Sequence, residues 1–360
     1  MLFGPTPANF FLNVRRLIVL SLFLVSRPIF AESFYPVVGP IPIRNQNPLY
    51  LQSLDLRPER PVVLPSGSYE VEMAAPYSNI FERRTSTTSG YQLALDMELL
   101  RNSFLFHYGF LDQFEVGLEL PFLHFDGGFL DSFVQGFHNA FGFPNGGRED
   151  FPNDSFDYTI RKNGTTVYQV KEQGYGLSDL VLDFKYQLLE EQKKIPALAT
   201  AFYLKLPTGD RSLGLGSGNT DLGFQLSAEK SYDRFHGMVN LGYFLIGGND
   251  LLVEINNSNL FAWMAGLEVS LIRDIWSGMI QLSGSSSLFH GTGFPELDDP
   301  VLNLTIGFSG KIGDQQQWTI AFQEDPVADD AAIDFTAWFQ WCTKWGGPKK
   351  IRGLLLGKAL

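Results

Sequence analysis

The sequence predicts an all-β protein, an antiparallel transmembrane β-barrel of about twelve strands with a long extracellular loop that contains a short helix. From residue 67 onward, segments of about ten residues alternate large apolar side chains with polar or small ones, which is the period of a strand with two different faces. The connections between these segments alternate between short and long, as in outer-membrane barrels. Aromatic residues make up 14% of the chain and gather near the segment ends, where membrane interfaces hold them.

Each expected strand shows this alternation, and the length of the runs suits a tilted strand that crosses a bilayer. Near Leu99 and Leu100 the phase of the alternation slips, and we interpret the slip as a bulge or a tight turn. The alternating segments, with the two on either side of the slip given separately, lie at 69–73, 93–98, 104–110, 114–122, 180–186, 198–206, 222–229, 235–245, 261–271, 276–282, 302–308, 318–322 and 335–341.

The connections set an orientation for the barrel. Short turns such as "SYDRF" and "LIRDIW" fall on one side and are expected in the periplasm, as in outer-membrane barrels. Long loops fall on the other side and are expected outside the cell. The long loops are 83–90, 126–174, 207–219, 246–258, 291–299 and 325–331.

A soluble two-sheet sandwich is the alternative, because its strands also alternate. A sandwich would bury the polar faces' carboxylates, and each unpaired buried carboxylate costs several kcal/mol. A wet or hydrogen-bonded lumen tolerates them, and closure leaves no unpaired strand edge in lipid. The barrel is therefore the preferred prediction.

The two ends of the chain differ from the barrel in composition. Arg15 and Arg16 precede the apolar run "LIVLSLFLV", and a small residue follows at Ala31, so we predict a signal peptide over residues 1–31. Residues 32–66 are rich in proline and are expected to form an extended, irregular periplasmic leader. The barrel is expected over 67–341, and residues 342–360 form a C-terminal extension.

Composition argues against several functions. The formal net charge is −12 without any Lys/Arg-rich tract, so nucleic acid is not an expected partner. The single cysteine, Cys342, excludes an internal disulfide and a cysteine-based zinc site. The five histidines lie on different segments without helical pairing, so we expect no metal and no cofactor.

A glycine-rich stretch, "LPTGDRSLGLGSGNTDLG", raises the question of a phosphate-binding loop. No Lys follows its glycines, and the flanks alternate with period two instead of opening a helix. We interpret it as a loop between two strands.

The polar faces supply the candidate site. If they point inward, acidic residues outnumber basic ones, and the lumen favours cations; the alternative is a closed polar network that only holds the barrel together. The lumen-facing candidates are Glu115, Glu119, Asp179, Asp183, Lys185, Lys205, Asp221, Glu229 and Glu268, with Glu70, Glu72, Asp96, Glu98 and Lys311 on the same expected face.

The loop 127–143 has an apolar stripe at helical spacing that includes Phe129, Phe133 and Phe137. One interpretation is a helix that plugs or gates the barrel mouth, with Gly-Gly pairs as hinges. The other is a helix that rests on the outer rim. The residues alone favour neither.

Several stretches resemble an uncharacterised Gram-negative family, the domain-of-unknown-function family 3187. They are "GPIPIRNQNPLYLQSL", "LPSGSYEVEMAAPYSNIFE", "EVGLELPF", "GGFLDSFVQGFHNAFGFPNGGRE" and "KLPTGD…LGSGNTDLG". The last is also similar, more weakly, to outer-membrane barrels encoded with aromatic-degradation pathways. The resemblance covers residues 39–341 and implies an outer-membrane location, but it supplies no activity and no catalytic residue. Such barrels usually end on an aromatic residue, whereas this chain continues past Trp341.

The expected function is therefore an outer-membrane channel or transporter for small or amphipathic solutes. Two alternatives stay open, an enzyme acting on lipid or saccharide and a non-conducting structural or adhesion barrel. "FHGTGF" at 289–294 invites a serine-hydrolase interpretation, but no nucleophile elbow accompanies it. The expected partners are outer-membrane lipid, an unidentified solute and the barrel-assembly machinery.

Overall fold

A computed structural model describes residues 38–142, 145–248, 256–272, 275–313, 315–326, 333 and 335–346. The predicted signal peptide and the end of the C-terminal extension lie outside the described residues. Among the residues described, no helix combines the length and apolar character needed to cross a membrane.

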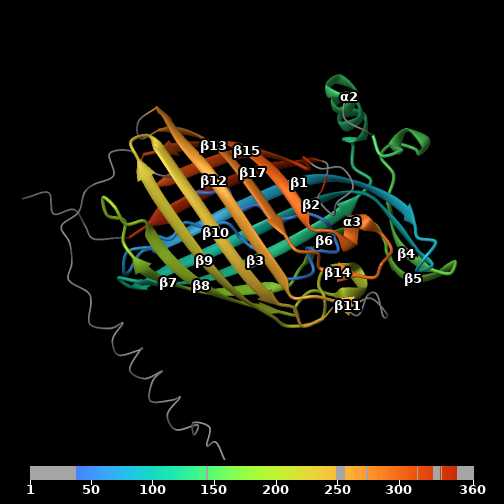
Figure 1. Cartoon of the computed structure of the whole chain (residues 1–360), viewed down its shortest axis with the longest axis horizontal. Coiled ribbons are helices and arrows are strands. Elements are labelled where there is room, and N and C mark those ends of the chain that lie inside the picture. Colours follow the sequence, from blue (N-terminus) through green and yellow to red (C-terminus); the bar gives the residue numbers. More distant parts are fainter. Residues whose placement is uncertain are drawn as a thin grey trace, which may run out of the picture. The chain divides into compact units, whose positions relative to one another are not determined.

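The strands form one closed antiparallel barrel, which confirms the predicted fold class and strand number (Figure 1). Each strand pairs with its neighbour in the chain, and closure comes from the pairing of the first strand with the last, Tyr69 opposite Trp345. The twelve strands are β1 (Tyr69–Thr85), β2 (Tyr91–Leu111), β3 (Phe114–Asp126), β7 (Leu180–Leu189), β8 (Ala197–Leu206), β9 (Asp221–Tyr232), β10 (Phe235–Leu245), β12 (Leu260–Ile272), β13 (Trp276–Ser285), β15 (Val301–Ile312), β16 (Gln316–Glu324) and β17 (Phe335–Trp345).

The two faces of the wall differ as the alternation predicts. On β10, Val239 and Leu241 point outward and are 45% and 41% exposed, whereas Asn240 between them points inward and is fully buried. Neighbouring strands repeat this pattern, with exposed outward residues such as Phe224 and Ile280. The outer surface is thus a continuous apolar band around a polar interior.

Short turns gather at one end of the barrel, here called the short-turn end, and long connections gather at the long-loop end. At the short-turn end Asp233 adopts a positive φ of 54° in the β9–β10 turn, a conformation that Asp tolerates better than most residues. The long connections carry α2 (Asp131–Phe141), η1 (Arg148–Asp150), β4 (Asp157–Lys162), β5 (Thr165–Val170), β6 (Gln173–Leu177), η2 (Arg211–Leu213), β11 (Asn256–Asn257), β14 (Phe289–His290) and α3 (Pro295–Asp298).

The expected break at Leu99–Leu100 is wrong, because β2 is one continuous strand of 21 residues. Its register with β1 and with β3 runs unshifted through Leu99 and Leu100. The apparent slip has another cause. Toward the long-loop end both faces of β2 are buried, so Leu95 and Met97 on the inner face and Glu98 on the outer face are all covered.

Two expected boundaries change. The last strand continues four residues past the expected end, to Trp345, so the barrel does close on an aromatic residue. Residues 38–66 form no strand, as expected, but they are not an external leader. They lie inside the barrel, where Ile41, Ile43 and Tyr50 are at most 2% exposed.

Candidate functional site

The candidate site is the lumen together with residues 38–66, here called the lumen segment. Val38 donates to Glu268 near the short-turn end of β12, at 2.9 Å. At the long-loop end, the hydroxyl of Tyr50 accepts a hydrogen bond from the Leu288 amide at 3.2 Å. The segment then returns, and Leu64 donates to Glu115 near the short-turn end of β3 at 2.7 Å. The lumen segment is therefore a U with an ascending arm (38–45), a tip (46–53) and a descending arm (54–66).

Only side chains fasten this U to the wall. Among the described residues, no backbone group of 38–66 is hydrogen-bonded to a backbone group of a strand; such bonds begin at Gly67 and Ser68, which pair with Gly109. Proline at positions 40 and 42 removes donors that a ladder would need. The segment can therefore move without breaking the barrel's own backbone pairing.

The descending arm is held by ion pairs to the inner wall. Arg57 Nη2 lies 2.7 Å from Asp183, and its Nη1 lies 3.7 Å from Glu119. Arg60 binds Glu229 through two nitrogens, each at 2.8 Å. The wall also supplies a cation, because Lys185 Nζ lies 3.5 Å from Glu59. Wall and segment thus neutralise each other, as buried charges require.

Further wall side chains bind the segment's backbone. Asp221 accepts from the Leu54 amide at 2.8 Å, and Asn240 accepts from the Glu59 amide at 2.7 Å. Lys205 donates to the Gln52 carbonyl at 2.6 Å while lying 2.9 Å from Asp221. Because the segment makes no ladder, these side chains provide the hydrogen bonds that its buried peptide groups need.

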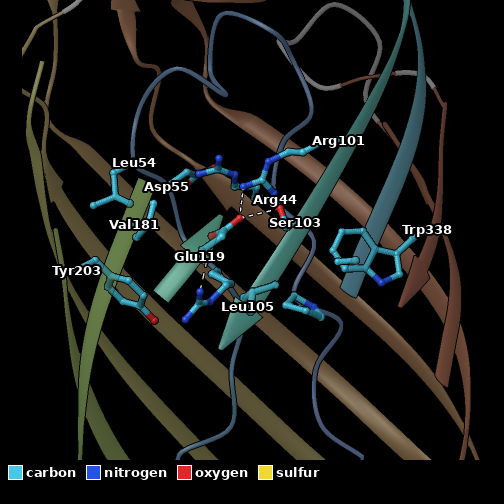
Figure 2. Close-up of a pocket in the computed structure, with 13 residues that line it drawn as sticks. Arg44, Leu54, Asp55, Arg101, Ser103, Leu105, Glu119, Val181, Tyr203 and Trp338 are labelled. Carbon is cyan, nitrogen blue, oxygen red and sulfur yellow. Dashed lines mark hydrogen bonds and ion pairs between the residues drawn. The ribbon is translucent and has the colours of Figure 1, made fainter. Parts of the chain in front are cut away.

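A cluster of charges lies between the two arms, around Glu119 (Figure 2). Glu119 accepts from Arg101 and, at 2.8 Å, from Ser103 on β2. The ascending arm contributes Arg44 to the same cavity, and the descending arm contributes Asp55. A water-sized sphere has about 20 Å³ in which to move there, which is room for about one water molecule. The cavity that remains between the two arms is therefore small.

The ascending arm is held differently. Val38 and Gly39 donate to Glu268, and Ile41 exchanges two hydrogen bonds with the Gln281 side chain at 3.1 and 3.0 Å. Apart from Glu268, the wall partners named here are uncharged, and Arg44 of this arm lies in the same cavity as Glu119. Ile41 and Ile43 are 1% and 0% exposed, so apolar packing also helps to hold this arm.

Glycines on the inner wall make room for the segment. A Cβ at position 307 on β15 would overlap the Ile41 side chain. At Gly223 and Gly242, a Cβ would overlap the inward ring of Phe244 and would also lie 3.0 Å from the side chains of Leu54 and Leu56, respectively. The wall is therefore shaped to receive both arms.

The structure places all nine lumen-facing candidates on the inner side, each at most 6% exposed. Each is bonded to the lumen segment, to another inner charge or to both. Sequence reasoning missed their partners Arg57, Glu59 and Arg60. A signal was present, since an acidic inner wall needs buried cations and the proline-rich stretch contains "RPER".

Two further candidates lie elsewhere. Asp96 and Glu98 are on the outer face of β2 and are buried under residues 127–156; Glu98 accepts from the Phe129 amide at 2.8 Å, and Asp96 accepts from Ser155 at 2.9 Å. Their expected inward orientation is wrong, because β2 has no break that would turn them inward.

The aromatic residues of the long loop lie outside the wall. Phe129 stacks on Tyr77 of β1 with ring centroids 5.7 Å apart, and Phe133 meets Phe335 of β17 edge to face at 5.5 Å. Phe137 contacts the outward-facing ring of β16 at 6.0 Å. Figure 1 shows α2 beyond the ring of strands at the long-loop end. These are the contacts of a helix on the outer rim, and the lumen is filled by another part of the chain.

Two other groups of reactive side chains lie close together in the structure. Ligand atoms of Glu70, Glu72 and Cys342 lie within 4.8 Å of one another, but Lys344 and Cys342 donate to Glu70, and Gln340 donates to Glu72. These carboxylates are satisfied as they stand.

In "FHGTGF", His290 Nδ1 lies 3.3 Å from Ser287 Oγ. Within the part of the chain described, no carboxylate is hydrogen-bonded to His290, the third contact that a catalytic triad uses.

A twelve-stranded antiparallel barrel with short turns at one end and long loops at the other has the fold of outer-membrane channels. The chain belongs to DUF3187, a family described as proteins of unknown function, whose model matches residues 16–345. A search of curated protein sequences found no significant match.

Among solved structures, the chain is similar to a COG4313 outer membrane channel from Pseudomonas putida F1, with a TM-score of 0.53 and 14% identity over 81% of this chain and 100% of that chain. The NanC porin has a TM-score of 0.42 and 7% identity over 77% of this chain and 99% of that one. The KdgM porin has a TM-score of 0.39 and 7% identity over 78% and 99%. At these identities the similarity concerns the fold.

Proposed function

We propose that the protein is an outer-membrane channel whose lumen segment closes it in the state described here. The observation that carries the proposal is the way the segment is attached. It fills the lumen, yet it is joined to the strands only by side-chain bonds, most of them between charged or polar groups that water can replace. If the lumen only had to make the barrel stable, apolar side chains of similar volume would serve as well as these buried ion pairs or better.

The outward apolar band supports a place in the bilayer, with lipid as the partner of Phe224, Leu241 and their neighbours. By the usual arrangement of bacterial barrels, the short-turn end faces the periplasm and the long-loop end faces outward. Export by the predicted signal peptide and insertion by the barrel-assembly machinery belong to the same proposal.

We propose small or amphipathic solutes as the cargo. Without the lumen segment, the inner wall presents Glu115, Glu119, Asp183, Glu229 and Glu268 with fewer cations than carboxylates. A lumen freed completely would therefore favour cations over anions.

The test compares the full chain with a variant that lacks residues 38–64, in planar bilayers and in proteoliposome swelling. The full chain is expected to conduct little, whereas the deletion variant should conduct steadily and prefer cations. Heat-modifiable gel migration verifies folding, and removal of α2 provides a control deletion outside the lumen that should leave the conductance unchanged.

A non-conducting structural barrel is the second candidate, because the cavity between the arms holds about one water. A folded deletion variant that conducts no more than an empty bilayer would favour this candidate and refute the channel.

A further inference from the structure

The inner wall is divided into a charged half and an uncharged half. Strands β1–β3 and β7–β9 carry inward charged residues, and those of β3, β7 and β9 bind the descending arm, among them Asp183, Lys185 and Glu229. On β13, β15, β16 and β17 the buried inward side chains between the two ends of the barrel carry no charge; Met279 and Trp338 lie among them, and the polar ones are hydroxyls and amides. They include Gln281, Asn303, Thr305, Ser309, Thr319, Gln323, Thr336 and Gln340.

These four strands are adjacent in the barrel, so their polar side chains face the same part of the lumen, and this surface is here called the uncharged track. Several members bond to one another across strands. Ser309 and Thr319 lie 2.9 Å apart, and Gln323 donates to Thr305 at 3.3 Å. Hydroxyls and amides both donate and accept hydrogen bonds, so the track can bind polar groups of either kind without a charge.

The ascending arm covers part of this track. Ile41 is bonded to Gln281 of β13, and its side chain fills the space over Gly307 of β15. Ile43 lies beside Ser283 and Asn303 in a second small cavity. The descending arm, in contrast, is held by ion pairs on the charged half and continues directly into β1.

We propose that the channel opens by withdrawal of the ascending arm alone, and that the passage so formed carries small uncharged hydrophilic solutes such as polyols and short saccharides. This inference rests on the proposed channel function. The two arms differ in the interactions that are lost when each leaves the wall. The descending arm would expose several buried charges, which is costly unless they stay paired. The ascending arm gives up a few hydrogen bonds, the burial of two isoleucines and the place of Arg44 near Glu119, which keeps Arg101 and Arg57 as partners.

The ionic preference of the passage follows from which arm moves. If the descending arm stays, Asp183, Glu119 and Glu229 remain paired with Arg57 and Arg60. The passage then runs along hydroxyls and amides, and it discriminates weakly between cations and anions. This differs from the barrel without any lumen segment, which should favour cations.

The first experiment measures which arm moves in the full chain. Single cysteines replace Ile43 on the ascending arm or Leu56 on the descending arm, in a Cys342→Ser background. The two positions form a matched pair, because they are 0% and 3% exposed. Reconstituted protein is treated with a small maleimide. The expected result is labelling at position 43 about tenfold or more faster than at position 56. Equal rates, or faster labelling at position 56, would overturn the inference.

The second experiment measures what passes. Ile41→Ser with Ile43→Ser loosens the ascending arm, and Arg57→Gln with Arg60→Gln loosens the descending arm. In swelling assays with mannitol and sucrose, the first variant should exceed the full chain by about tenfold or more, with a reversal potential near zero in a salt gradient. The second should show a cation-selective reversal potential.

The outcomes separate this inference from the channel itself. A strongly cation-selective current in the isoleucine variant, or no swelling from a folded isoleucine variant, would refute withdrawal of the ascending arm. In either case the channel proposal stands if the barrel without residues 38–64 conducts. If that barrel does not conduct, the channel proposal fails first.

Discussion

Replacement of Arg57 by glutamine should release the lumen segment part of the time. The Asp183 side chain is 1% exposed and lies 2.7 Å from Arg57. Removal of one partner from a buried ion pair costs about 3–5 kcal/mol, because the other charge stays buried and unpaired. Here the cost is at the lower end, about 3 kcal/mol, since His107 lies 3.8 Å from Asp183 and Glu119 keeps its bond from Arg101. That raises the undocked fraction about a hundredfold.

Single-channel recording in planar bilayers measures the effect as open probability, with Arg57→Gln, Asp183→Asn and the double variant compared with the full chain. The pair should show a coupling energy of about 1–3 kcal/mol, because the double variant replaces a charged pair by a neutral one. The reasoning is refuted if Arg57→Gln, correctly folded, opens no more often than the full chain. It is also refuted if the two single effects simply add.

Three further changes probe other parts of the structure. Gly307→Val should crowd Ile41 and destabilise docking of the ascending arm by about 1–3 kcal/mol, which would appear as increased conductance; unchanged conductance would contradict the close approach seen here. Leu241→Arg on the outward apolar band should make folding into lipid less favourable by about 2–4 kcal/mol, whereas Tyr232→Arg at the short-turn rim should cost about 0–1 kcal/mol; equal costs in vesicle-folding titrations would refute the proposed lipid contact. Phe133→Ala should loosen α2 by about 1 kcal/mol and leave conductance as it is, and a change in gating would show that α2 takes part in closure.

Much of the barrel could be predicted because its two faces meet different surroundings. The alternation on β10, with exposed Leu241 beside buried Asn240, is the direct consequence of that difference. The prediction of a bulge or turn at Leu99–Leu100 failed because the two faces of β2 have similar surroundings there. Toward the long-loop end of β2, the lumen segment and the loop 127–156 cover both faces, so Leu95 and Glu98 are equally buried and the pattern resembles a slip.

Sequence analysis predicted the wall residues of the candidate site but not the lumen segment that binds them. The inward charges followed from alternation, but their partners did not, because proline excludes a strand without excluding burial. Ile41 and Ile43 stand between prolines and polar residues, a spacing that has no regular period to recognise. The charge balance was the available clue. Buried carboxylates such as Asp183 and Glu229 need cations, and the chain supplies Arg57 and Arg60 just before the first strand.

The central claim is that residues 38–66 fill the barrel in the membrane, and cross-linking tests it most directly. A photoreactive amino acid at position 43 is activated in intact cells, and the cross-linked peptides are identified by mass spectrometry. The structure predicts adducts within the chain itself, to the stretch of β13 and β15 that includes Ser283 and Asn303. Adducts to other periplasmic proteins, with none to the wall of the same folded barrel, would contradict the account.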